Sequence, residues 1–203
     1  MIKHIWFDFS GTLIKLDKDK HNHLRYSSYA EAVKKPLDEE LIKEYGKMLE
    51  KHASNSGVFR SLGLPGSYWA DRVNSLGPAE YASLADPKIL EVLPKLKAML
   101  PISLFTNIHP DNFLKALGIK PNWFTHIIQG GMVKEPKPNL EGFNKMIELS
   151  KEQPQNLLYV GDSIEKDIRP AKQVGIKTCL VWEKSTEADY SIMKFEELLT
   201  IFI

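Results

Sequence analysis

Four short, almost wholly apolar runs constrain the fold of this 203-residue chain more than any other feature. They are IKHIWF at 2–7, ISLFT at 102–106, NLLYV at 156–160 and IKTCLV at 176–181, with FTHII at 124–128 as a weaker fifth. A strand that faces solvent on one side alternates polar and apolar residues, whereas a strand covered on both faces is continuously apolar. The runs therefore predict a buried, mainly parallel sheet.

Helical patterns separate these runs. Residues 87–99 place apolar side chains near a 3.6-residue period, although Pro94 should kink the helix. We expect a second helix over NLEGFNKMIELS with Asn139 as its N-cap, and a third over 163–174 that ends at Gly175. Strands and helices that alternate in this way predict an α/β fold with a doubly wound parallel sheet.

One long segment interrupts the alternation. Residues 15 to about 85 contain no convincing strand but several helical stretches, such as DEELIKEYGKMLEKHA at 38–53. We interpret residues 15–85 as a small all-helical cap domain over the edge of the sheet. The α/β core domain would then consist of residues 1–14 and 86–203.

Composition limits the binding partners and the cellular compartment that we expect for this chain. A chain with 43% hydrophobic and 26% charged residues is typical of soluble globular proteins, and a net charge of +1 predicts no nucleic-acid or membrane partner. The first residues, MIKHIWFDFS, lack the apolar core of a secretory signal, so we expect a cytoplasmic protein. We further expect a monomer or a homodimer. The single cysteine, Cys179, excludes an internal disulfide and is expected to be a buried structural thiol.

Polar residues follow the predicted strands at the point where each one ends. In an open parallel sheet, ligands bind beyond the carboxyl ends of the strands, so these residues should meet at one edge. They are Asp8, Thr106, Asn107, Asp162, Ser163 and Asp167, joined by Lys134 and Lys137 from the segment KEPKP.

This set of side chains has a chemical logic. Carboxylates from different strands repel one another unless a cation lies among them, and oxygen ligands without His or Cys suit Mg²⁺. A Thr hydroxyl and a Lys ammonium beside the metal would bind a phosphoryl dianion. Asp8 could then act as a nucleophile that forms an aspartyl-phosphate.

The motifs DFSGTL, LFTN, KPNLEGF and VGDSIEKD occur in the order of the four motifs of the haloacid dehalogenase superfamily, which this chain resembles. Most members are Mg²⁺-dependent phosphatases with a Rossmann-like core, so the resemblance implies a hydrolase of a small phosphorylated metabolite. It runs from residue 8 to residue 167. The long gap between Thr12 and Thr106 is similar to the helical cap that many members insert after the first motif.

The resemblance also implies a role for each matching residue. Asp8 would be both nucleophile and metal ligand, and Ser10 would offer the metal its backbone carbonyl. Asp162 would hold Mg²⁺, and Asp167 would support it directly or through water.

On the substrate side, Thr106 would bind the phosphoryl oxygens and Asn107 would help to orient the site. Lys137 would neutralise charge between Asp8 and the substrate. The lysine motif lacks its usual second proline, so Lys134, from the same loop, stays open as an alternative to Lys137.

Ser10 is the main departure from the family pattern. Phosphatases of this family usually carry a second Asp there, which protonates the leaving group and then activates water. A serine hydroxyl does not shuttle that proton, and general acid–base catalysis is worth about 10² to 10⁴ in rate. Metal binding should survive, because the ligand expected at this position is a backbone carbonyl.

Three functions are therefore open. The first is a phosphatase, slow or dependent on another proton donor, that prefers acidic leaving groups. The second is a phosphonatase-like or dehalogenase-like hydrolase of a C–X bond; a phosphonatase would need a cap lysine such as Lys51, and Asp162 with Asp167 argues against a metal-free dehalogenase. The third is a catalytically weak protein that binds a phosphoryl ligand.

Overall fold

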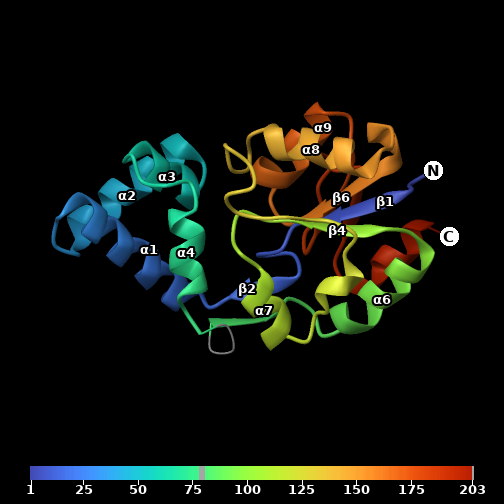
Figure 1. The fold of residues 1–203 in the computed structure, drawn as a ribbon, viewed down its shortest axis with the longest axis horizontal. Coiled ribbons are helices and arrows are strands. Elements are labelled where there is room, and N and C mark those ends of the chain that lie inside the picture. Colours follow the sequence, from blue (N-terminus) through green and yellow to red (C-terminus); the bar gives the residue numbers. More distant parts are fainter. Residues whose placement is uncertain (78–80, 203) are drawn as a thin grey trace.

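The computed structural model describes residues 1–77 and 81–202 and contains one six-stranded parallel sheet (Figure 1). The strand order is β5-β4-β1-β6-β7-β8, and every neighbouring pair is parallel. The strands are β1 (His4–Phe7), β4 (Ile102–Phe105), β5 (Ile127–Ile128), β6 (Leu157–Gly161), β7 (Lys177–Val181) and β8 (Tyr190–Ile192). The predicted doubly wound α/β fold is thus confirmed.

Helices cover the sheet on both faces, which explains the continuous apolar runs (Figure 1). On one face Trp6 packs in a cluster with residues of α8 (Glu141–Ser150) and α9 (Arg169–Gln173). On the other face Ile5 and Phe7, which flank Trp6 in β1, pack in a cluster with residues of α6 (Ile89–Met99) and of the C-terminal helix η4 (Phe195–Phe202). Each large apolar side chain buried in this way contributes about 1.5–3 kcal/mol of transfer free energy.

Two helix boundaries differ from those predicted. Asn139 is not the N-cap of α8: Leu140 occupies that position, and the Asn139 side chain instead accepts the backbone N–H of Glu141 at 2.9 Å. The predicted helix over 163–174 is divided into a π-helical turn, η3 (Ile164–Ile168), and α9, whose first turn contains Pro170. Proline lacks an N–H, so it fits the start of a second helix better than the interior of one.

The shorter elements of the core connect these layers. They are α7 (Asp111–Ala116), η1 (Pro121–Trp123) and η2 (Pro154–Asn156). The predicted strand at 124–128 is realised only as the two residues of β5, at the edge of the sheet beside β4.

In the part of the chain that the structure describes, four helices lie beside the sheet, on the side toward which the carboxyl ends of its strands point (Figure 1). They are α1 (Lys18–Val33), α2 (Glu39–His52), α3 (Asn55–Ser61) and α4 (Tyr68–Asn74). Side chains cap α2 and α3, because Asp38 accepts from Leu41 N at 2.8 Å and Ser54 from Gly57 N at 3.0 Å. No helix in the described part of the chain has the length and apolar character needed to cross a membrane.

A small ribbon joins these helices to the sheet. β2 (Ile14–Leu16) pairs antiparallel with β3 (Ala82–Leu84), so the prediction that residues 15–85 contain no strand was wrong. Strands of three residues are too short to display a period of two. Residues 78–80, inside the predicted cap range, lie outside the described residues, and the domain boundaries at 14/15 and 85/86 stay predictions.

His4 is a buried histidine at the start of β1. The Ser103 hydroxyl accepts the backbone N–H of His126 at 3.0 Å and forms a hydrogen bond with His4 Nε2 at 2.8 Å. Burial, reinforced by His126, lowers the pKa of His4 to about 4. The folded protein therefore holds this imidazole neutral at pH values where the unfolded chain is protonated.

The free energy of unfolding should consequently fall as the pH drops. The stability linked to His4 is complete above pH 6.5 and is lost as the pH falls toward 4, by up to about 3 kcal/mol. His4→Gln should flatten this dependence in urea unfolding at pH 7 and pH 4.5. The control His23→Gln, on an exposed part of α1, should follow the wild-type curve, and an equally steep curve for His4→Gln would contradict this assignment.

Candidate functional site

Asp8 lies directly after β1, at the carboxyl edge of the sheet, with its side chain buried. The chain then turns tightly at Gly11, whose φ is +99°. A Cβ on Gly11 would lie 2.2 Å from Asp162 Oδ2, so only glycine fits both this conformation and this approach. The turn brings back Thr12, whose hydroxyl donates to Asp8 Oδ2 at 3.1 Å and lies 3.4 Å from Asp162 Oδ1.

Lys137 reaches Asp8 from the loop before α8 and is only 3% exposed. Its Nζ donates to Asp8 Oδ1 at 2.5 Å, Asp167 Oδ1 at 2.8 Å and Tyr159 OH at 2.8 Å, so all three ammonium protons are used. Of the two candidate lysines, the structure places Lys137 in the site, whereas Lys134 is exposed.

Asn107 holds the backbone of this lysine in place. Its Oδ1 accepts the backbone N–H of Lys137 at 3.0 Å, and its Nδ2 donates to the backbone carbonyl of Lys137 at 3.4 Å. A side-chain amide that pairs with both backbone groups of one residue fixes the direction in which that residue leaves its loop. Asn107 therefore fixes the backbone of Lys137 beside Asp8.

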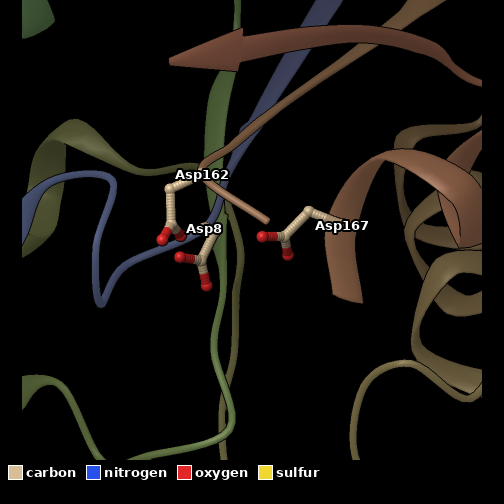
Figure 2. A group of neighbouring side chains, drawn as sticks. All are labelled: Asp8, Asp162 and Asp167. Atoms are coloured by element: carbon tan, nitrogen blue, oxygen red, sulfur yellow. The ribbon is translucent and has the colours of Figure 1, made fainter. Parts of the chain in front are cut away.

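Three carboxylates converge here, and their oxygens lie within 4.8 Å of one another (Figure 2). Burial, followed by the charges of Asp8 and Asp167, raises the pKa of Asp162 to about 8. Burial also raises the pKa of Asp8, although Lys137 opposes it. When all three carboxylates are ionised, the one ammonium among them leaves an excess of two negative charges, which fits a hard divalent cation.

Asp167 and Asp162 differ in how fully they are hydrogen-bonded. The Oδ1 of Asp167 accepts from Lys137 and from Tyr159 OH at 3.1 Å, and its Oδ2 accepts from Ser163 N at 3.1 Å. Asp162 accepts a long contact from Thr12 at 3.4 Å and a bond from its own backbone N–H. Asp162 therefore has the most available oxygens for a cation, whereas Asp8 and Asp167 both bind the ammonium group of Lys137.

A pocket of about 470 Å³ opens over these groups. Every residue predicted for the site lines it: Asp8, Ser10, Thr106, Asn107, Lys137, Asp162 and Asp167. Thr106 Oγ1 accepts the backbone N–H of Ile108 at 3.2 Å, which leaves its own proton free to donate to a ligand. The Ser10 hydroxyl is buried and has no hydrogen-bond partner among the described residues.

Sequence reasoning missed two groups of site residues. Tyr159 was treated only as the interior of a strand, and Thr12 only as part of a motif; their hydrogen bonds to Lys137 and Asp8 depend on tertiary structure. The second group comes from the helices beside the sheet and consists of His21, Ser54, Asn55, Ser56 and Trp69.

Comparisons of the sequence and of the structure with known proteins point to the same family. A family model described as haloacid dehalogenase-like hydrolase matches residues 5–181. The glyceraldehyde 3-phosphate phosphatase of Methanocaldococcus jannaschii is 29% identical over 99% of this chain and 97% of its own length. The enzyme of the same name from Pyrococcus abyssi is 30% identical over 91% and 82%. The crystal structure of a HAD phosphatase from Thermococcus onnurineus superimposes with a TM-score of 0.73 at 22% identity, covering 99% and 98% of the two chains.

The excess of negative charge makes a specific prediction about Asp162→Asn. Without metal, the variant should unfold at a higher temperature than wild type, because one of three repelling carboxylates is removed. At a Mg²⁺ concentration about 100 times its Kd, wild type should gain about 5–10 °C in Tm, and Asp162→Asn should lose this gain.

The matched control for this measurement is Asp111→Asn, which changes an exposed carboxylate on α7. It should keep the full response to Mg²⁺. A magnesium-dependent shift of wild-type size in Asp162→Asn would show that the cation does not bind at this cluster.

Proposed function

The chain belongs to the haloacid dehalogenase-like hydrolases, and from this premise we propose that it is a Mg²⁺-dependent phosphatase that reacts through Asp8. The observation that carries the proposal is the buried cluster of Asp8, Asp162 and Asp167, in which Lys137 is the one ammonium partner that the described residues provide within salt-bridge distance. A divalent cation would restore the balance of charge, and the pocket could then accept a phosphate dianion.

Asp8 and Asp162 would hold the cation, with the backbone carbonyl of Ser10, and Asp167 would support it directly or through water. When bound, Mg²⁺ supplies positive charge that draws electron density away from the phosphoryl oxygens. The Thr106 hydroxyl, whose proton is free, would donate to one of these oxygens. Lys137 would add its positive charge from the other side of Asp8.

In the first chemical step an Asp8 oxygen bonds to phosphorus and the bond from phosphorus to the leaving oxygen breaks, which gives an aspartyl-phosphate. Water then attacks phosphorus and the bond from phosphorus to the Asp8 oxygen breaks, which releases phosphate and restores the Asp8 carboxylate. The proton that this water loses passes through solvent to the alkoxide released in the first step. Lys137 stays protonated throughout: burial alone would lower its pKa, but Asp167 and Asp8 raise it well above the usual value. It therefore contributes charge rather than a proton.

The leaving oxygen consequently lacks an efficient proton donor. Ser10 is not acidic enough, and His21 has both ring nitrogens in contact with other side chains, Tyr81 and Asn55. Burial also lowers the pKa of His21 to about 4, so its imidazole is neutral near pH 7. Acidic leaving groups should therefore react far faster than alkoxides.

Glyceraldehyde 3-phosphate is the first substrate to test, because both relatives named above are phosphatases of this compound. A pocket of about 470 Å³ has room for a molecule of this size. Lys51, the lysine named for the phosphonatase alternative, is exposed on α2 and does not line the pocket.

The decisive comparison is between wild type and Ser10→Asp, with Mg²⁺, on p-nitrophenyl phosphate and on glyceraldehyde 3-phosphate. The added carboxyl should raise kcat/KM for the alkyl ester by about 10² to 10⁴. It should change hydrolysis of p-nitrophenyl phosphate far less, because that leaving group needs no proton. Ser10→Ala should behave like wild type on both compounds.

Two results would count against the proposal. If Ser10→Asp fails to raise turnover of the alkyl ester, the missing proton donor is not what limits this protein. If no variant hydrolyses p-nitrophenyl phosphate with Mg²⁺, the protein is not a phosphatase, and retained binding of phosphate would favour a ligand-binding role.

A further inference from the structure

The helices beside the sheet contribute only uncharged side chains to the part of the pocket that the structure describes. Ser54, Asn55 and Ser56, at the N-terminus of α3, form a continuous stretch that we call the 54–56 wall. Trp69 from α4 and the neutral His21 from α1 border it, and their rings meet edge to face at 5.3 Å. This wall faces a ligand whose phosphoryl group would lie at Asp8.

Asn55 is held in one orientation by a chain of hydrogen bonds. Tyr45 OH donates to Asn55 Oδ1 at 2.5 Å, and Asn55 Nδ2 donates to His21 Nε2 at 3.3 Å. Because His21 Nε2 accepts, the ring proton is on Nδ1, which donates to Tyr81 OH at 2.5 Å. Tyr45 and Tyr81 are each only 1% exposed, so both ends of the chain are fixed in the core.

The 54–56 wall retains hydrogen-bond donors that the protein itself does not use. A carboxamide has two N–H donors, and Asn55 gives only one of them to His21. The Ser54 hydroxyl accepts from Gly57 N as a helix cap, which leaves its proton free. The Ser56 hydroxyl lines the pocket and has no hydrogen-bond partner within the described ranges. Three adjacent donors are thus available to oxygen atoms of a ligand.

We propose that the 54–56 wall binds hydroxyl or carbonyl oxygens on the leaving-group half of the substrate, with Tyr45 and His21 as positioning residues for Asn55. The substrates selected would be hydroxylated alkyl phosphates of the triose or polyol type. The inference rests on the proposed function only in placing the phosphoryl group at Asp8.

The balance of charge in the pocket favours an uncharged leaving group. Its lining carries three lysines and three aspartates, because Lys15 and Lys166 line the pocket together with Lys137 and the acidic cluster. A divalent cation would make the lining net positive by two charges, which one phosphate dianion cancels. A second anionic group on the substrate would leave an uncompensated charge, at a cost in desolvation.

The test measures binding rather than turnover, with phosphonates that resist hydrolysis. Wild type with Mg²⁺ is titrated in a calorimeter with 3,4-dihydroxybutylphosphonate, butylphosphonate and 3-carboxypropylphosphonate. The dihydroxy compound should bind at least about tenfold more tightly than the butyl compound, as expected for hydrogen bonds to oriented donors. Asn55→Leu and Tyr45→Phe should each reduce this ratio toward one.

Tyr26→Phe is the matched control, because Tyr26 OH contacts Arg25 rather than Asn55, and it should keep the wild-type ratio. Equal binding of the dihydroxy and butyl compounds would overturn the inference. So would tighter binding of the carboxy compound, or failure of all three to bind. Hydrolysis of p-nitrophenyl phosphate is measured in parallel: a preserved binding ratio without hydrolysis would reject the phosphatase proposal but not the 54–56 wall.

Discussion

The ammonium group of Lys137, buried between Asp8 and Asp167, is the interaction on which the rest of the site depends. Its three partners come from the end of β1, from β6 and from the turn after β6, so one cation ties together segments more than a hundred residues apart in the chain. Removing one member of a buried ion pair commonly costs about 3–5 kcal/mol, because the remaining charge is left uncompensated. The same ammonium group thus stabilises this edge of the sheet and fixes the position of Asp8.

The hydrogen bonds also give the acidic side chains different roles. The oxygens of Asp167 accept hydrogen bonds from Lys137, Tyr159 and a backbone N–H. The oxygens of Asp162 accept fewer bonds and stay more available to a cation. The cluster therefore has a side that is closed by the protein and a side that is open to a cation. Ser10 lies at the same pocket but adds no titratable group, which separates the capacity to bind a phosphoryl group from the capacity to expel a poor leaving group.

The sequence sufficed for the sheet and for most of the site, because long apolar runs and the polar residues after them are local signals. It failed where the cause is not local. β2 and β3 are stabilised by pairing across some seventy residues, and three residues are too few to show a pattern. Tyr159 resembles any buried strand residue until Lys137 is placed against it. Ser54, Asn55 and Ser56 resemble an ordinary helix start, since serine and asparagine also favour N-caps. Their contact with the pocket is a property of how α3 packs.

The central claim is that Asp8 is the nucleophile, and the most direct measurement is to look for the phosphoryl group on it. Wild type is mixed with p-nitrophenyl phosphate and Mg²⁺, quenched in acid during turnover, digested and analysed by mass spectrometry. The account predicts one phosphoryl group on the peptide that contains Asp8, at a higher level in wild type than in Ser10→Asp because serine does not activate the attacking water. Asp8→Asn and samples with a chelator should lack it. Hydrolysis at the wild-type rate with Asp8 unmodified, or with the phosphoryl group on another residue, would contradict the account.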